Sequence, residues 1–243
     1  MLQYLRHTAC VCQSLCVLWL AGCQISPMHP SIAPQTSRSL PSEVTSEKGV
    51  RYEVLPDHSD IRFLVCRAGP LAKLGHNHVI QAKNIRGEIN LAQDVHQSGV
   101  FIEIPVKDFL VDDSAARLDE GQEFFPQPDE EAVAGTARNM LGEKMLNTSK
   151  FPMIEIRAVA LKGPVWGMDI MVRIKMHGRE REMVVPTAVE KNGDTFVVTA
   201  FFSINQTDFG ITPMRVFGEG LQVADAVGVR MRLVAGRMEL RSQ

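Results

Sequence analysis

Residues 177–211, HGREREMVVPTAVEKNGDTFVVTAFFSINQTDFGI, contain the pattern that decides the fold. Within this stretch apolar residues at even positions alternate with more polar ones, which is the period of a half-buried β-strand. The apolar row consists of Phe196, Val198, Ala200, Phe202 and Ile204. Just before this row, Asn192-Gly193 favours a type I′ hairpin turn, because both residues tolerate the positive φ that the turn requires.

The segment that precedes this stretch, residues 165–176, alternates in the same way, with charged residues on its other face. Its apolar face consists of Met168, Ile170, Val172, Ile174 and Met176. His177-Gly178 then supplies a turn between the two segments. Together the segments predict an antiparallel meander with one continuous apolar face, which either encloses apolar material or packs against it.

Period-two alternation recurs along the rest of the chain, around residues 52–55, 61–68, 85–91, 100–106, 154–160 and 227–233. The exception is 129–146, where apolar residues fall at helical spacing after an acidic first turn. A barrel of about eight strands fills its interior with side chains or holds one small ligand, and closure removes exposed edges. The sequence therefore predicts an all-β antiparallel barrel of about eight strands with one accessory helix, which lids a barrel end or covers its wall.

Several motifs, taken in their order and spacing, resemble the YceI-like family. They are Asp57-His58-Ser59 before Ile61-Arg62-Phe63, the run from Phe151 to Ile156, a strand ending in His177-Gly178, and the run from Ser203 to Ile211. The resemblance covers about residues 51–237. It implies an extended, lipocalin-like barrel that binds isoprenoid or other long-chain lipids.

The N-terminus predicts a secreted lipoprotein. Residues 9–20 form a short apolar run, too short to span a membrane but sufficient for a signal peptide. Leu20-Ala21-Gly22-Cys23 resembles a bacterial lipobox, in which Cys23 is lipidated and anchors the chain to a membrane. An ordinary signal peptide or an uncleaved anchor is the alternative. Gln24 after the cysteine favours the outer membrane over the inner one.

Three segments follow from this interpretation: a lipoprotein-type signal peptide over 1–22, a Pro- and Ser-rich tether over 23–50 that begins at the lipidated cysteine, and the barrel domain over 51–243. Only Cys66 would then remain as a free thiol, so the mature chain is expected to have no internal disulfide. Cys66 lies in a strand pattern and is expected to act as a small packed apolar residue.

Leu74-Gly75-His76-Asn77-His78-Val79 is the sharpest polar motif. In an extended segment His76 and His78 share a face, as a metal-binding pair requires. A third ligand would have to come from elsewhere, with His58, His177 or Asp57 as candidates. The alternative, which we adopt, is that both histidines form hydrogen bonds to backbone or to a ligand head group and that no metal is bound.

A group of acidic residues predicts only a solvated loop, because it lacks the pattern of a Ca²⁺ loop. The group is Asp112, Asp113, Asp119 and Glu120. The chain has no phosphate-binding glycine loop or dinucleotide motif, which argues against such cofactors. Its net charge of −2 and interspersed basic residues argue against a nucleic-acid partner.

Three functions remain open: a binding module, a metal-dependent or redox enzyme built on the His76/His78 loop, and an envelope interaction protein whose barrel is full. Because nothing else resembles a catalytic set, we expect a binding protein, not an enzyme, that transports or stores a long-chain lipid in the envelope. A homodimer is left open. The expected ligand contacts are His76 and His78 at the opening and, inside, Ile104, Ile170, Val172, Ile174, Val198 and Phe202.

Overall fold

The computed structural model of the chain describes residues 49–238 except 217 and 219. These residues belong to one compact unit that spans 41–243. The expected signal peptide, the lipidated Cys23 and nearly all of the tether lie outside the described residues, so they stay predictions. Within the described part of the chain, no helix is long and apolar enough to cross a membrane.

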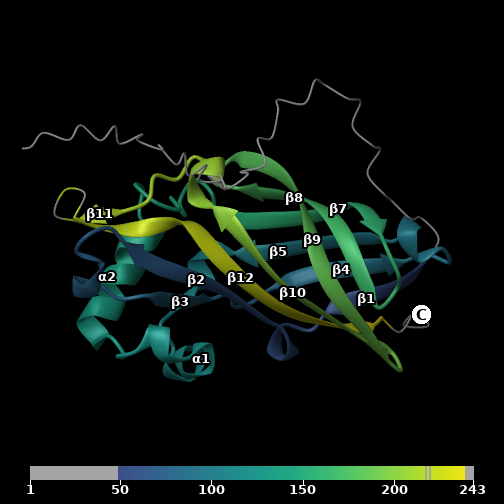
Figure 1. The fold of residues 1–243 in the computed structure, drawn as a ribbon. Helices are drawn as coiled ribbons and strands as arrows, with labels where there is room; N and C mark the ends of the chain where they lie inside the picture. The colour runs from purple at the N-terminus through teal and green to yellow at the C-terminus, as the bar shows by residue number, and fades with distance from the viewer. Residues whose placement is uncertain (1–48, 217, 219, 239–243) are drawn as a thin grey trace, which may run out of the picture. The chain divides into compact units, whose positions relative to one another are not determined.

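The described residues form twelve strands that pair antiparallel in one sheet (Figure 1). The order along the sheet is β1-β4-β5-β7-β8-β9-β10-β12-β2-β3-β6, and β11 pairs with β12. The strands are β1 Val50–Val54, β2 Asp60–Ala68, β3 His78–Gln81, β4 Arg86–Leu91, β5 Gly99–Pro105, β6 Leu110–Val111, β7 Met153–Lys162, β8 Gly167–Met176, β9 Arg179–Asn192, β10 Thr195–Asn205, β11 Arg215–Val216 and β12 Leu221–Arg237.

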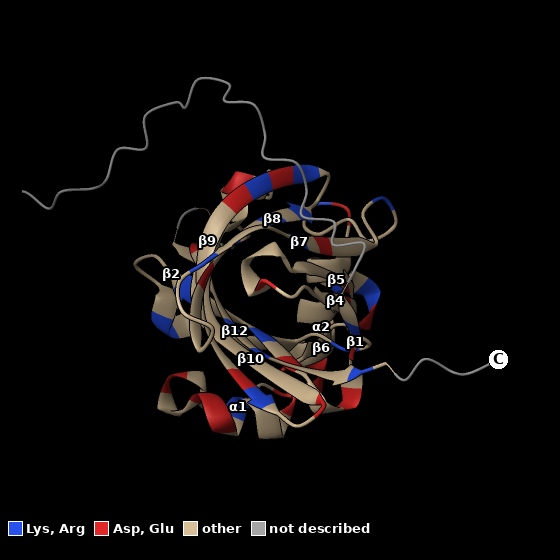
Figure 2. Ribbon diagram, turned by 90° about the vertical axis from the view of Figure 1, so that its right-hand side faces the viewer, with Lys and Arg blue, Asp and Glu red and all other residues tan. Residues whose placement is uncertain are grey.

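The sheet closes into a barrel because β12 pairs with β1 as well as with β10. Tyr52 lies opposite Arg237 and Val54 opposite Ala235. Eight strands thus form the ring that Figure 2 shows end-on: β1, β4, β5, β7, β8, β9, β10 and β12. The predicted antiparallel barrel of about eight strands is confirmed. Over residues 222–232, the edge of β12 that faces β1 further along pairs with β2. Strand β2 pairs with β3, and β3 with β6, so these strands extend the barrel wall.

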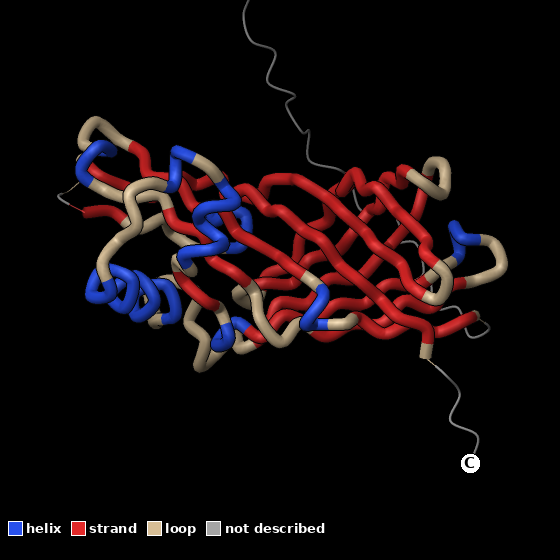
Figure 3. The backbone as a smooth tube through the Cα atoms, turned by 90° about the horizontal axis from the view of Figure 1, so that it is seen from below, coloured by secondary structure: helices blue, strands red, loops and turns tan. Residues whose placement is uncertain are grey.

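Two α-helices lie toward the same end of the barrel (Figure 3): α1 Ser114–Glu120 and α2 Glu130–Leu141. The predicted accessory helix is α2, whose first turn is capped by Asp129, accepting from the amide of Ala132 at 2.8 Å. The expectation of a single helix was wrong, because α1 also forms. Asp113 caps it by accepting from the amide of Ala116 at 3.1 Å.

The hairpin between β9 and β10 forms as expected, but its turn is shifted by one residue. Asn192 pairs with Thr195, so the central turn residues are Gly193 and Asp194. Only Gly193 has a positive φ, of 59°, which is the type II′ pattern and not the expected type I′. The β8–β9 turn has the two positive φ values of a type I′ turn, 50° at His177 and 74° at Gly178.

One apolar cluster of the barrel interior, which we call the central cluster, draws inward-facing residues from β2 and from every strand of the ring except β4. Ile61, Ile104 and Ile174 are among its buried members. A second cluster, where β1 meets β12, contains Tyr52 and Phe196, whose rings stack edge-on with centroids 4.8 Å apart. Much of the interior is therefore packed side chains.

Candidate functional site

A cavity of about 290 Å³ lies at the end of the barrel where α2 packs. It is bounded by β2, β3, α2, the end of β10 and the start of β12. Its wall is mostly apolar and rich in methionine, a flexible side chain that adapts to irregular ligands. The larger apolar side chains on this wall are Phe63, Phe109, Met140, Met145, Met176 and Met214.

Helix α2 presents one face to the cavity. Ala132, Thr136 and Met140 all line it and are spaced four residues apart, so they lie above one another on the helix. Their small and flexible side chains leave space beside the helix. The prediction that this helix packs against the barrel wall or end agrees with this position.

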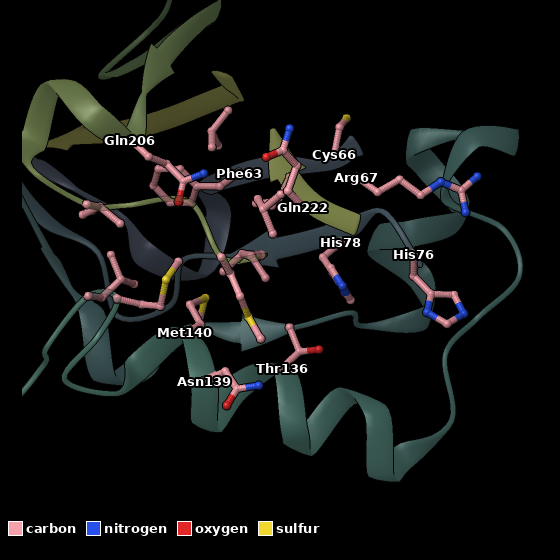
Figure 4. A pocket seen from close by; sticks show the side chains of 18 of the residues that line it. Phe63, Cys66, Arg67, His76, His78, Thr136, Asn139, Met140, Gln206 and Gln222 are labelled. Carbon is pink, nitrogen blue, oxygen red and sulfur yellow. The ribbon is translucent and has the colours of Figure 1, made fainter. Parts of the chain in front are cut away.

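The charged and imidazole side chains of the cavity wall are unevenly placed. Arg67, His76 and His78, which we call the polar end, lie to one side in Figure 4, whereas the uncharged Gln206 and Asn139 lie toward the other side with Phe63 and Met140. Pairing of β2 with β3 sets the positions of the polar end: Val65 lies opposite His78, and the amide of Arg67 donates to Asn77 Oδ1 at 3.0 Å. The rings of His76 and His78 have centroids 6.5 Å apart.

His78 is fixed by a buried carboxylate behind it. His78 Nδ1 lies 2.6 Å from Asp112 Oδ2. The other oxygen, Oδ1, accepts from the amide of Val79 at 2.9 Å and from Arg117 Nη1 at 2.5 Å. The Asp112 side chain is 0% exposed, the Arg117 side chain 2% and His78 18%. An ionised Asp112 favours the tautomer with the proton on Nδ1.

Arg117 ties this pair to the surrounding loops. Besides Asp112, it donates to the carbonyls of Asn77, Phe124 and Pro126. A buried guanidinium needs such partners, because desolvation of an unpaired charge is very unfavourable. Arg117 therefore connects β3, α1 and the segment leading to α2 around the polar end of the cavity.

The expectation of a solvated acidic loop was wrong for two residues. Asp112 is buried, and the side chain of Glu120 is 1% exposed between Arg62 at 3.1 Å and Arg230 at 3.0 Å. Asp119 is 65% exposed and agrees with the expectation. Both acids are buried because arginines neutralise them: Arg117, five residues along the chain, pairs with Asp112, and the distant Arg62 and Arg230 pair with Glu120.

The electrostatics of the site follow from these contacts. Burial opposes ionisation of Asp112, but the hydrogen bond and charge of His78, the Val79 amide and Arg117 outweigh it and lower the pKa of the carboxyl. Burial, aided by the negative charge of Glu123, raises the pKa of the Cys66 thiol. Cys66 is a half-buried free thiol on the cavity wall, and its raised pKa favours the unreactive thiol form.

Neither histidine lies in a metal-binding cluster of the described residues, which hold no group of three or more His, Cys, Asp or Glu suited to a metal. His78 Nδ1 already faces Asp112. Of the candidate third ligands, His177 packs on Phe151 and its Nδ1 lies 3.2 Å from the Phe209 carbonyl. The absence of a bound metal stays a prediction.

The structure places the predicted ligand contacts in two different regions. Only His76 and His78 line the cavity. The apolar residues instead belong to the central cluster: three are buried in it and three pack against it. They are, in that order, Ile104, Val172 and Ile174, then Ile170, Val198 and Phe202. Whether these six residues contact a ligand stays a prediction. Sequence reasoning missed the cavity-lining Arg67 and the buried pair of Asp112 and Arg117, for which the local pattern gives no signal.

Comparisons with known proteins agree with this architecture. The model of the YceI-like domain matches residues 52–235. The structure of BcnA from Burkholderia cenocepacia is similar with a TM-score of 0.55 at 14% identity, covering 74% of this chain and 98% of that one. A polyisoprenoid binding domain from Saccharophagus degradans, implicated in plant cell wall breakdown, is similar with a TM-score of 0.54 at 11% identity, covering 78% and 99%.

At these identities the structural likeness concerns the fold alone. No curated protein sequence matches the chain. The family match extends over most of the chain and over every strand of the closed ring, in agreement with the motifs found in the sequence. This chain belongs to the YceI-like family.

Proposed function

We propose that this protein binds the apolar chain of a long-chain lipid, of the isoprenoid or a related type, and holds it for transport or storage. The observation that supports the proposal most strongly is the mainly apolar cavity beside α2, with Arg67, His76 and His78 on one side. Ligand pockets have this character: a mainly hydrophobic wall with a few placed polar groups. The polyisoprenoid binding domain from Saccharophagus degradans, which has a similar fold, supports the same class of ligand.

The size of the cavity limits how much of a ligand it holds. Its volume of about 290 Å³ is at the lower end of the range for small-molecule sites, about 300–1,000 Å³. The central cluster borders the cavity, because Ile154, Met176 and Ile211 belong to both. We therefore propose that the cavity takes one segment of the chain, and that longer chains enter further by displacing the methionines that line it.

Micromolar binding is within reach of such a site. It corresponds to about 8 kcal/mol, or about 330 Å² of apolar surface at about 25 cal/mol per Å². The ligand also loses translational and rotational freedom on binding, which costs at least about 4 kcal/mol and raises the apolar area that must be buried to about 500 Å². This buried area is the sum of ligand surface and cavity-wall surface, so a partly inserted chain is sufficient for micromolar binding.

We also propose that the protein works in the bacterial envelope, anchored through Cys23 and facing the periplasm, with the outer membrane favoured. This rests on the lipobox-like sequence at 20–23 and on the Pro- and Ser-rich segment after it. The proposal is a binding protein, in which Asp112, also held by Arg117, fixes the His78 ring for a hydrogen bond to the ligand.

Displacement of a neutral, apolar fluorescent probe tests the proposed function. Ala132 lines the cavity, whereas Ala134 on the same helix is exposed and does not. In Ala132→Trp the indole fills the space beside the helix, so we expect probe affinity to fall at least tenfold. Ala134→Trp carries the same indole outside and should bind as the wild type does.

Thermal unfolding of both variants shows whether the fold is retained. If Ala132→Trp is folded and binds the probe as tightly as Ala134→Trp, the ligand does not enter this cavity. If the wild type binds no apolar probe at all, the proposed function itself is wrong.

A further inference from the structure

We propose that the head group of the ligand is an oxyanion, a carboxylate or a phosphate, held by Arg67 with His76 and His78. This inference rests on the proposed function and adds the charge class of the ligand to it. It comes from the charges around the cavity, in particular from an arginine whose charge is not neutralised by an ion pair.

Arg67 is the only described lining residue with a permanent charge. Its backbone is fixed on both sides, by Asn77 and by pairing with Val223 of β12. The guanidinium donates through Nη1 to the carbonyl of Gly75, which supplies no charge. Among the described residues, no carboxylate lies within ion-pair distance of it, whereas Arg62 and Arg117 are each paired with acids.

The lining itself contains no aspartate or glutamate among the described residues. Asp112 lies behind His78, 0% exposed, and its oxygens already face Arg117, His78 and the Val79 amide. Glu123 is close enough to act on the Cys66 thiol, together with Arg67, but does not line the cavity. The polar end therefore presents positive charge and hydrogen-bond donors to a ligand.

This arrangement discriminates among head groups by charge. Arg67 carries the only permanent charge of the described lining, so the charge of a head group decides how it interacts with this end of the cavity. An amine head would meet an uncompensated cation, and an alcohol would leave the guanidinium without a counter-ion. A carboxylate or phosphate can accept two parallel hydrogen bonds from an arginine.

The position of the polar end also fixes the direction of the ligand. Arg67 and His76 lie toward the β2–β3 connection, and Met140 of α2 lies on the other side (Figure 4). The head group would remain at the β2–β3 connection while the chain lies along α2. His78, oriented by Asp112, contacts the head between these two regions.

Four probes with the same twelve-carbon chain test this inference: laurate, dodecyl phosphate, dodecanol and dodecylamine. Each competes with the neutral fluorescent probe at low salt. We expect laurate and dodecyl phosphate to bind at least tenfold more tightly than dodecanol, and dodecylamine to bind most weakly. Equal binding of the two anions indicates that the site recognises the shared oxyanion, and a preference for one identifies the source of the head group. Either result supports the inference.

Arg67→Gln should reduce the preference for the anions at least tenfold while leaving dodecanol unchanged, because it removes the charge-assisted hydrogen bonds to the head group. Arg86→Gln, an exposed position on β4 outside the cavity, is the matched control. If Arg67→Gln does not fold, Arg67→Lys keeps the charge, and it should retain the preference for anions.

The salt dependence of the wild type gives a readout that needs no variant, since salt should weaken the anions and not dodecanol. The inference is overturned if dodecanol or dodecylamine binds the wild type as tightly as the tighter of the two anions, or if Arg67→Gln keeps the full preference. If none of the four compounds displaces the probe, the proposed apolar-chain function fails instead.

Discussion

Replacement of Asp112 by Asn removes the buried charge behind His78 while preserving the shape of the side chain. The buried carboxylate accepts from Val79 and Arg117 on one oxygen and faces His78 on the other. An asparagine can still accept with its single oxygen from Val79 and Arg117. Its amide must then face His78 Nδ1, which forces the histidine proton onto Nε2.

The expected loss of stability follows from the charge left behind. Breaking a buried ion pair by removing one partner destabilises a protein by about 3–5 kcal/mol. Arg117 keeps three backbone carbonyls as partners, so we expect the lower end, about 3 kcal/mol. With a urea m-value of about 2 kcal/mol per M, the unfolding midpoint should fall by about 1.5 M.

Urea unfolding followed by far-ultraviolet circular dichroism measures this midpoint. Asp119→Asn is the matched control, since Asp119 pairs with Arg62 at 3.0 Å but is 65% exposed, and exposed pairs contribute about 1 kcal/mol or less. If Asp112→Asn shifts the midpoint no more than Asp119→Asn does, the buried pair with Arg117 is not the structural centre that we describe.

Three further predictions concern pH, metal and membrane attachment. Because the folded-state pKa of Asp112 is lowered, its contribution to stability is complete above the unfolded value of about 3.9 and is lost as pH falls through the folded value. The stability difference between wild type and Asp112→Asn, measured by urea unfolding, should therefore be full at pH 5 and smaller at pH 3, and a constant difference would contradict this assignment. Chelation should leave the melting temperature unchanged, whereas a stoichiometric metal that is lost in His78→Ala would favour the enzyme alternative. Cys23→Ser should release the protein from membranes or leave an uncleaved precursor, and unchanged fractionation with an unchanged mature mass would refute lipidation.

The strands that the sequence predicts well are those with one buried and one exposed face. In β8 and β10, alternation continues for the whole length of the strand, so the local pattern is sufficient. Helix α2 is recognisable from its acidic first turn and apolar spacing. Strands β3 and β6 have only four and two residues, too few for a period to appear, and their pairing depends on the fold around them.

The candidate site was only partly predictable, for two physical reasons. Alternation shows that Ile104 and Val172 face the barrel interior, but it does not show whether side chains from opposite walls meet inside the barrel. In the structure both residues pack in the central cluster. Burial of Asp112 depends on His78, 34 residues away in sequence, and on Arg117 in a helix that the sequence did not reveal. The His76/His78 motif was recognisable because its two histidines lie two positions apart in the sequence.

The decisive experiment is native mass spectrometry of protein purified from bacterial cells without detergent, with Cys23→Ser in every sample so that no lipid anchor holds it in a membrane. It asks whether the cavity beside α2 holds one apolar chain. We expect one bound species per chain with the wild-type cavity and in Ala134→Trp, recoverable by organic extraction, and a loss of that species in a folded Ala132→Trp. Retention of the same species at full stoichiometry in Ala132→Trp would contradict this expectation.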